Sequence, residues 1–202
     1  MYGALAELTF KVFPAPRAYH TIRFEADELG TALAALNRVA GGQMDIHALD
    51  LVREERWQLW IRLSGLADAL PARTERLCAI LGGGCQEQDD LGAAFWTASR
   101  EFTWAPPDAA LVKLPVTPGR IPLVEQAIGP LGVRRRYAGG GQVAWLATTD
   151  VTALDRALEG TGPALVLRGP DAGRVRIGAP APASFEARVK PALDPAGRFP
   201  VR

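Results

Sequence analysis

Residues that build metal sites and disulfide frameworks are scarce in this chain. Its 202 residues include two cysteines, Cys78 and Cys85, and two histidines, His20 and His47. Two cysteines cannot supply a disulfide framework or a four-cysteine zinc site, and neither Cys-x-x-Cys nor His-x-x-x-His occurs. The sequence therefore predicts no metal site and two reduced structural thiols, as expected in a reducing cytoplasm.

Strong net charge and long apolar runs are also missing. The formal net charge is +1, which gives no bulk attraction to nucleic acid or to an anionic membrane. No apolar run approaches the roughly 20 residues that span a bilayer. The first residues show no basic region followed by an apolar stretch and a cleavage site. We expect a cytoplasmic protein with no membrane span and no nucleic-acid partner.

The apolar residues that are present follow two periods. The hydrophobic fraction of 48% suits a globular core. Alternation predicts strands and spacing of three or four predicts helices. In the first part of the chain the elements come in the order strand, helix, strand, strand, helix, strand, and a further helix follows. They cover residues 19–24, 26–39, 44–52, 56–63, 66–81, 85–88 and 91–102.

The same order recurs after Pro106-Pro107. Strands are expected at residues 110–116, 132–138, 142–148 and 164–168, with helices at 121–128 and 151–159. Two β-α-β-β-α-β units predict an α+β protein in which two ferredoxin-like units lie side by side. Each is expected to form an antiparallel sheet with helices on one face. Residues 169–184, rich in Gly, Pro and Ala, predict a linker to a final helix.

A sheet covered by helices on one face leaves the other face free, and alternation assigns side chains to each face. In the strand at 164–168, Leu165 and Leu167 are expected in the core, with Val166 and Arg168 on the free face. The candidate substrate-binding residues on the free face are aromatic or cationic. They are Arg23, Trp60, Arg62, Lys113, Trp145 and Arg168. A guanidinium can donate two parallel hydrogen bonds to a carboxylate. The alternative is that these arginines lie flat over apolar neighbours with their charge in water.

Other conspicuous groups have simple structural explanations. The run Arg134-Arg135-Arg136 suits an anion site or a solvated edge strand that its charge protects from pairing. His20 and His47 lack an acidic residue at a fixed spacing, which favours structural or surface roles over that of a general base. The clusters Gly82–84 and Gly139–141 predict a helix stop and a hairpin turn, because neither has the context of a phosphate-binding loop.

Both ends of the chain carry short motifs that are typical of one known protein family. The tail has Lys190 followed by Asp194-Pro195-Ala196-Gly197, and residues 3–14 read GALAELTFKVFP. Between them lie FWTASRE at 95–101 and GGGQVAWL at 139–146. These segments resemble FAD-linked oxidases and are similar to the E subunit of glycolate oxidase. Relatives end in Asn-Pro-Gly-basic, whereas this chain ends in Phe-Pro-Val-Arg and lacks the asparagine that packs near the flavin.

The resemblance covers the C-terminal half of the family's architecture and implies a domain plan. Residues 1–16 correspond to the last strand of a flavin-binding domain that the chain lacks. Residues 17–105 form the first unit plus an extra helix, 106–170 the second unit, and 171–202 the linker and C-terminal helix of the cap domain. In the family the two units form one larger sheet that lies over the flavin. Lys190, Asp194 and Pro195 would then belong to a cofactor-facing tail.

The resemblance implies a cap, or substrate-domain, fragment of a flavin-dependent 2-hydroxy-acid oxidoreductase. FAD serves the intact family, but this chain alone is expected to bind none and not to catalyse. Expected partners are a flavin domain or other subunits of an oxidase complex, or a second copy pairing through the N-terminal strand. The alternative is a non-catalytic tandem ferredoxin-like module for ligand binding or subunit assembly. An RNA-binding sheet is disfavoured, because the free face lacks the required aromatic cluster and the protein is not basic.

Overall fold

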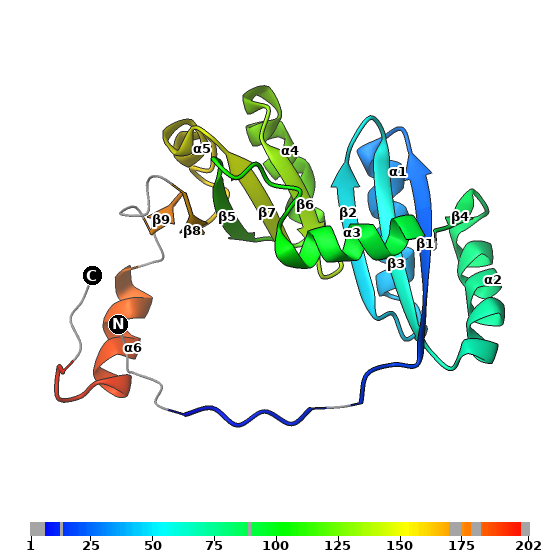
Figure 1. Ribbon diagram of the computed structural model, residues 1–202. Helices are drawn as coiled ribbons and strands as arrows, with labels where there is room; N and C mark the ends of the chain where they lie inside the picture. The colour runs from blue at the N-terminus through cyan, green and yellow to red at the C-terminus, as the bar shows by residue number, and fades with distance from the viewer. Residues whose placement is uncertain (1–6, 13, 89, 170–174, 179–182, 199–202) are drawn as a thin grey trace.

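The computed structural model describes residues 7–12, 14–88, 90–169, 175–178 and 183–198. It is an α+β structure with one antiparallel sheet of nine strands in the order β4-β1-β3-β2-β6-β7-β5-β8-β9 (Figure 1). The described strands are β1 (Ala18–Ala26), β2 (Ala48–Arg53), β3 (Trp57–Gly65), β4 (Cys85–Glu87), β5 (Ala110–Pro115), β6 (Arg134–Ala138), β7 (Val143–Thr148), β8 (Ala164–Arg168) and β9 (Arg176–Ile177). The described α-helices are α1 (Leu29–Ala40), α2 (Leu70–Leu81), α3 (Asp90–Glu101), α4 (Ile121–Ile128), α5 (Val151–Ala157) and α6 (Ala183–Leu193).

The two halves of the sheet have matching strand orders. In the first half β1 lies between β3 and β4, and β2 follows β3. In the second half β5 lies between β7 and β8, and β6 follows β7. The halves join where β2 pairs with β6 through the partners Leu51–Tyr137 and Val52–Arg136. The single larger sheet agrees with what the family resemblance implied.

The main core lies between one face of the sheet and helices α1, α2, α4 and α5. Helix α1 shows why the sequence folds this way. Leu33, Leu36 and Val39 recur at helical spacing and are buried, and the helix ends at Gly41. In β3 the alternating residues Trp57, Leu59, Ile61 and Leu63 belong to the same core, as the sequence predicts.

Of the described helices, α3 is the one that packs on the opposite face of the sheet, across the first half and the junction (Figure 1). Its Phe95 and Trp96 pack on Trp60 of β3 and Val52 of β2. The chain that follows α3 continues over the second half, where Ala105 packs with Leu111 and Ala147. The expectation of helices on one face therefore holds for α1, α2, α4 and α5 and is wrong for α3.

Two expectations about individual strands are wrong. Strand β6 is central, between β2 and β7, so the run Arg134–136 is not in an edge strand. In β8 the core residues are Ala164 and Val166, while Leu165 and Leu167 are 38% and 55% exposed. The expected burial of the two leucines is thus inverted. Because Val112 pairs with Val166, the register places Val166 on the core side.

Two described segments, residues 7–12 and helix α6, lie away from the sheet. Residues 7–12 run as an exposed extended segment outside any described strand, and α6 lies apart from the sheet (Figure 1). Of the segment 1–16 that was expected to correspond to a flavin-domain strand, residues 1–6 and 13 lie outside the described residues, as does most of the expected linker. Strand β9, which pairs with β8, lies within that linker and was not predicted.

Candidate functional site

The face of the sheet opposite the main core is called here the open face. The register aligns one row of its side chains across six neighbouring strands, from β3 to β8. The row consists of Gln58, Val52, Arg136, Trp145, Lys113 and Leu165. Helix α3 covers the first part of this row and leaves the part beyond β6 more accessible. The sheet thereby brings together residues that are more than 100 positions apart in the sequence.

Trp60 is on the open face, as predicted, but it is covered by α3. Only 6% of its surface is exposed, because the Phe95 ring stacks on it with centroids 4.1 Å apart and planes 4° apart. Its indole N–H donates to Gln58 Oε1 at 3.1 Å. Aromatic stacking of this kind stabilises packing. Trp60 therefore anchors α3 in this structure and offers no free ring to a ligand.

Arg23 and Arg62 also lie on the open face, and they differ in how their charge is satisfied. Arg23 donates to Gln86 Oε1 at 2.7 Å, and its Nε lies 3.3 Å from Glu25 Oε1. The guanidinium of Arg62 instead lies over the Tyr19 ring, with Cζ 3.7 Å from the ring centroid. Arg23 Cζ also lies 5.7 Å from the Trp60 ring centroid, so both arginines contact an aromatic ring, and Arg23 differs in having Glu25 and Gln86 as partners.

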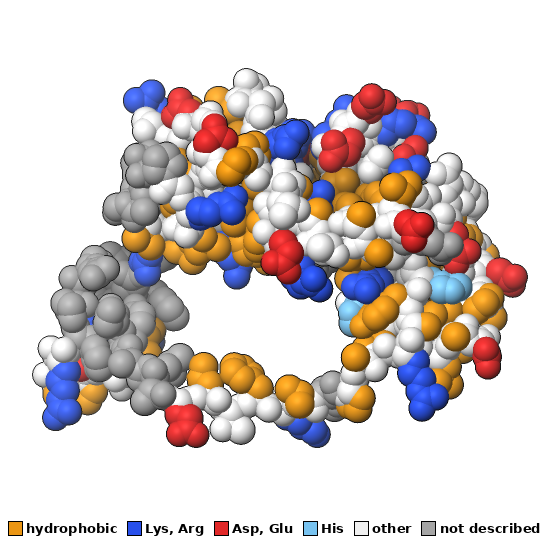
Figure 2. Space-filling model, viewed as in Figure 1, with side chains coloured by type: hydrophobic (Ala, Val, Ile, Leu, Met, Phe, Trp, Pro, Cys, Tyr) orange, Lys and Arg blue, Asp and Glu red, His pale blue; other side chains and the backbone are white. Residues whose placement is uncertain are grey.

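Lys113 and Trp145 form a partly exposed aromatic and cationic pair on the second half. They are register partners on β5 and β7, and Lys113 Nζ lies 5.6 Å from the Trp145 ring centroid. The Phe102 ring meets Trp145 edge-on at 4.7 Å. Leu165 is the partner of Lys113 on β8. Figure 2 shows hydrophobic and basic side chains gathered along the underside of this half.

Arg168 ends β8 and is exposed. A register shift between Leu111 and Val112 places Arg168 opposite Leu111. Of the six predicted residues, Lys113 and Trp145 form one group, and Arg23, Trp60 and Arg62 form another. Strands β2 and β6 separate these groups, so the open face does not gather all six into a single pocket.

A buried polar cluster at the junction of the halves was missed by the sequence analysis. Arg136 is 9% exposed and donates to Ser99 Oγ at 2.5 Å, and its Cζ lies 4.6 Å from the Phe95 ring and 5.2 Å from the Trp104 ring. Burial lowers its pKa, while Asp50 acts in the opposite direction. The only local signal is the arginine run, and it does not reveal which arginine becomes buried.

Asp50 on β2 is the acidic member of this cluster. It is 7% exposed and accepts a hydrogen bond from the Gly139 N–H at 3.3 Å. Burial raises its pKa to about 6, while the Gly139 hydrogen bond and the charge of Arg136 act against that rise. An acid that titrates near neutrality can exchange protons under physiological conditions. Its burial beside the α3 contact points first to a role in joining the halves.

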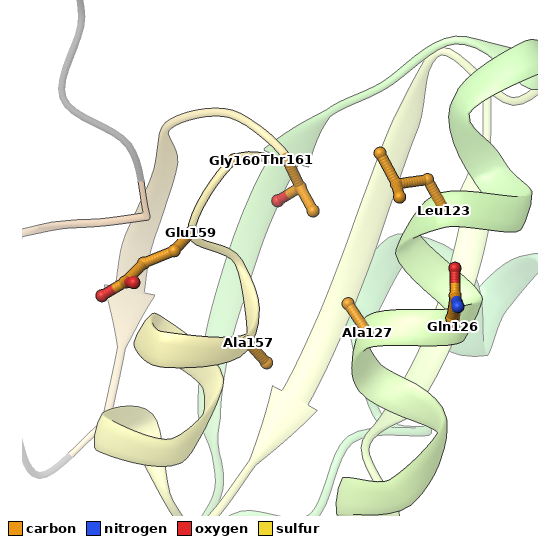
Figure 3. A pocket seen from close by; sticks show the side chains of 7 residues that line it. All are labelled: Leu123, Gln126, Ala127, Ala157, Glu159, Gly160 and Thr161. Carbon is orange, nitrogen blue, oxygen red and sulfur yellow. The ribbon is translucent and has the colours of Figure 1, made fainter.

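A cavity of about 350 Å³ lies on the helix side of the second half (Figure 3). Its lining residues come from α4, from α5 and from the turn after α5. They are Leu123, Gln126, Ala127, Ala157, Glu159, Gly160 and Thr161. The Thr161 hydroxyl donates to the Leu158 carbonyl at 2.7 Å, and in Figure 3 the Glu159 carboxylate points away from α4. The cavity lacks converging polar groups and is a weaker candidate than the open face.

The tail residues serve a local turn. Lys190 pairs with Asp194 one helical turn later, and Asp194 Oδ1 accepts from the Arg198 backbone N–H at 2.8 Å. Asp194 is 7% exposed, and Pro195 follows it as an exposed residue. This arrangement caps the end of α6. The expected contact with a cofactor stays a prediction.

The remaining sequence candidates take structural positions. His20 Nδ1 lies 2.7 Å from Glu87 Oε1 and 3.2 Å from Thr74 Oγ1, and the His47 ring meets Tyr19 edge-on at 5.1 Å. Gly82–84 follow α2, and Gly139–141 connect β6 to β7. All six of these glycines have positive φ, which favours glycine over other residues. In the described part of the chain, no three His, Cys, Asp or Glu side chains form a group that could hold a metal ion.

Comparison of the chain with protein-family models and with curated proteins yields no match. Among the described residues, every helix is too short or too polar to cross a membrane.

Proposed function

We propose that this chain is the cap portion of a flavin-dependent 2-hydroxy-acid oxidoreductase, similar to the E subunit of glycolate oxidase. We further propose that its two β-α-β-β-α-β halves are ferredoxin-like units. The motifs at both ends support the family assignment. The matching strand orders of the halves and their union in one antiparallel sheet are compatible with a cap of this kind.

The observation that carries the proposal is the partly exposed aromatic and cationic pair of Lys113 and Trp145 on the open face. A tryptophan on an open sheet face suits contact with a flat ring system, and the neighbouring ammonium suits the carboxylate of a hydroxy acid. The exposed Leu165 and Leu167 extend this surface with apolar area that a partner domain would bury. These side chains would hold the substrate and exclude water from one side of it.

The described residues do not fit a complete FAD site. A pyrophosphate is usually held by a glycine-rich loop that leads into a helix N-terminus. Here Gly82–84 follow a helix, and Gly139–141 connect two strands. In a complete oxidase the flavin would accept the electrons. We therefore propose that a flavin domain, in the same or a separate polypeptide, supplies the cofactor site and that this chain is not catalytic alone.

The test is to purify the chain from its native cells with its partners and record the visible spectrum. A yellow complex whose flavin absorption is bleached by glycolate or D-lactate supports the proposal. Trp145→Ala and Lys113→Ala should then raise KM for the hydroxy acid about tenfold or more, which is about 1.4 kcal/mol of lost binding. The exposed Arg38→Ala in α1, on the opposite face, is the control. A colourless complex, or a flavin that no 2-hydroxy acid reduces, would contradict the proposed function.

The alternative, a subunit-assembly module without catalysis, is favoured by one feature. The extended segment at residues 7–12 exposes 58% of Leu8, 74% of Phe10 and 83% of Val12. Apolar side chains at every second position suit a strand that adds to another sheet. This candidate function requires association with a partner but no flavin in the resulting complex.

A further inference from the structure

Arg62 lies on the open face of β3, and its charge has no acidic partner among the residues that the structure describes. Its Nε is buried and makes no hydrogen bond. Buried polar groups in folded proteins nearly always have a partner, so an unsatisfied guanidinium nitrogen calls for an explanation. The terminal nitrogens of the Arg62 guanidinium are not among these buried atoms and make no hydrogen bond to a described residue, so they are the donors that a ligand could reach.

The surroundings hold the guanidinium in a fixed orientation. Arg62 Cζ lies 3.7 Å from the centroid of the Tyr19 ring, and the His47 ring meets the Tyr19 ring edge-on with the two centroids 5.1 Å apart. The His47 backbone N–H donates to the Arg62 carbonyl at 2.9 Å, which ties this segment to β3. A guanidinium stacked on a ring keeps its N–H donors in its own plane, where two oxygen atoms can accept them.

Other arginines of the sheet show what Arg62 lacks. Arg23 has Glu25 and Gln86 as partners, and Arg135 donates to both carboxylate oxygens of Glu125 at 2.9 and 2.6 Å. The register neighbours of Arg62 are Thr21 and Ala48, and neither carries a charge. The Thr21 hydroxyl already accepts the indole N–H of Trp96 at 3.0 Å. Arg23 shares with Arg62 a buried Nε that makes no hydrogen bond, but Glu25 lies beside its charge, whereas Arg62 has no acidic partner among the described residues.

We propose that Arg62, positioned by Tyr19 and flanked by His47, binds the oxyanion of a small molecule, either a carboxylate or a phosphate. The guanidinium donates to two oxygens of the anion, and the half-exposed Tyr19 and exposed His47 contact the rest of the ligand. This site is in the first half of the sheet, apart from Lys113 and Trp145. It requires no flavin domain, so its failure and that of the proposed function are distinguishable.

The test uses the isotope-labelled chain and NMR spectroscopy, with inorganic phosphate and acetate as separate probes and sodium chloride at matched ionic strength. We expect a saturable shift of the Arg62 Nε–Hε signal and of the His47 ring signals. Saturation by phosphate alone would indicate a phosphate ligand, and saturation by acetate would indicate a carboxylate. Either result supports the site, while shifts that only follow ionic strength for both probes overturn it.

Arg62→Lys keeps the positive charge but removes the planar pair of donors. In this variant the saturable shift of the His47 signals should weaken at least tenfold in apparent affinity or vanish. Arg53→Lys is the matched control, because Arg53 also lies over an aromatic ring, with Cζ 5.5 Å from the Trp57 centroid. It should bind like the unmodified chain. Unchanged binding in a folded Arg62→Lys variant, verified by circular dichroism, would refute the assignment.

Discussion

At the scale of single residues, the buried pair Asp50 and Arg136 concentrates charge where the two halves meet. Removing charges from water is costly, and the pair offsets this only in part through mutual attraction and hydrogen bonds to Gly139 and Ser99. The raised pKa of Asp50 expresses that cost, since desolvation is its largest cause. The pair makes the junction sensitive to protonation.

The pKa of Asp50 gives stability a predictable pH dependence. The folded value of about 6 exceeds the ordinary 3.8, so the folded state binds this proton more tightly than the unfolded state. The contribution of Asp50 is therefore most favourable below about pH 4 and is lost as the pH rises through about 6. At about 1.4 kcal/mol per pK unit, the loss is about 3 kcal/mol.

Asp50→Asn cannot ionise, so we expect this loss of stability between pH 4 and pH 7 to disappear. Urea unfolding at several pH values measures the effect as the difference in the free energy of unfolding between variant and unmodified chain. Asp108→Asn, at an exposed position, serves as the control and should keep the original pH profile. If the Asp50→Asn variant kept the pH profile of the unmodified chain, the pH dependence of stability could not be attributed to Asp50.

At the scale of elements, α3 depends on one close approach to the sheet. Gly92 lies against Thr21 of β1, where an added Cβ would meet Thr21 Cβ at 2.5 Å and its Oγ1 at 2.8 Å. The same contact places Trp96 within hydrogen-bond distance of Thr21. A glycine here weakens the helix but allows it to pack closely enough for Phe95 to stack on Trp60.

Gly92→Ala should therefore lift α3 from the sheet and destabilise the protein by about 1–3 kcal/mol, despite the better helix propensity of alanine. Gly30→Ala in α1 is the matched control, because no atom lies within 4 Å of the added Cβ. It should raise the free energy of unfolding by about 0.5–1 kcal/mol. Denaturant unfolding followed by tryptophan fluorescence measures both. Equal stabilisation by the two substitutions would show that α3 does not need this contact.

The elements also show what local patterns can predict. Strict alternation assigned both faces of β3 correctly, because its two sets of side chains differ clearly in polarity. In β8 the run Leu165-Val166-Leu167 is apolar on both faces, so alternation alone does not indicate which side chains point into the core. The arginine run was misassigned because charge alone does not distinguish an edge strand from a central one. Ser99, Phe95 and Trp104 make the burial of Arg136 possible, and these residues are distant in sequence.

The open-face candidates were predicted to the extent that they depend on alternation. Lys113 and Trp145 came together because β5 and β7 pair in the expected way. The covering of Trp60 was not predictable, since the amphipathic pattern of α3 does not specify which face of the sheet it packs on. The cluster of Asp50 and Arg136 depends on the pairing of β2 with β6, which is a property of the whole sheet.

At the scale of the whole molecule, the exposed segment at residues 7–12 predicts association. Leu8, Phe10 and Val12 would bury their apolar area in a second sheet, so we expect the purified chain to associate as its concentration rises. Replacing all three by serine should yield a monomer at the same concentrations. Light scattering after size-exclusion chromatography measures the change.

The control variant carries serine at Leu66 and Leu131. These two leucines are 62% and 39% exposed and lie elsewhere on the molecule. This variant should associate like the unmodified chain. A monomeric unmodified chain at every concentration, or undiminished association of the triple variant, would contradict a role for the segment in assembly.

The way the halves meet has an architectural consequence. Strands β2 and β6 hold equivalent positions in their halves and run antiparallel to each other, so the contact has the two-fold form of an isologous dimer interface within one polypeptide. Covalent linkage makes the local concentration of each half around the other independent of dilution. The β2–β6 ladder itself is only two residue pairs long, and the core that both halves share and the contacts of Arg136 with α3 complete the junction that the linkage keeps together.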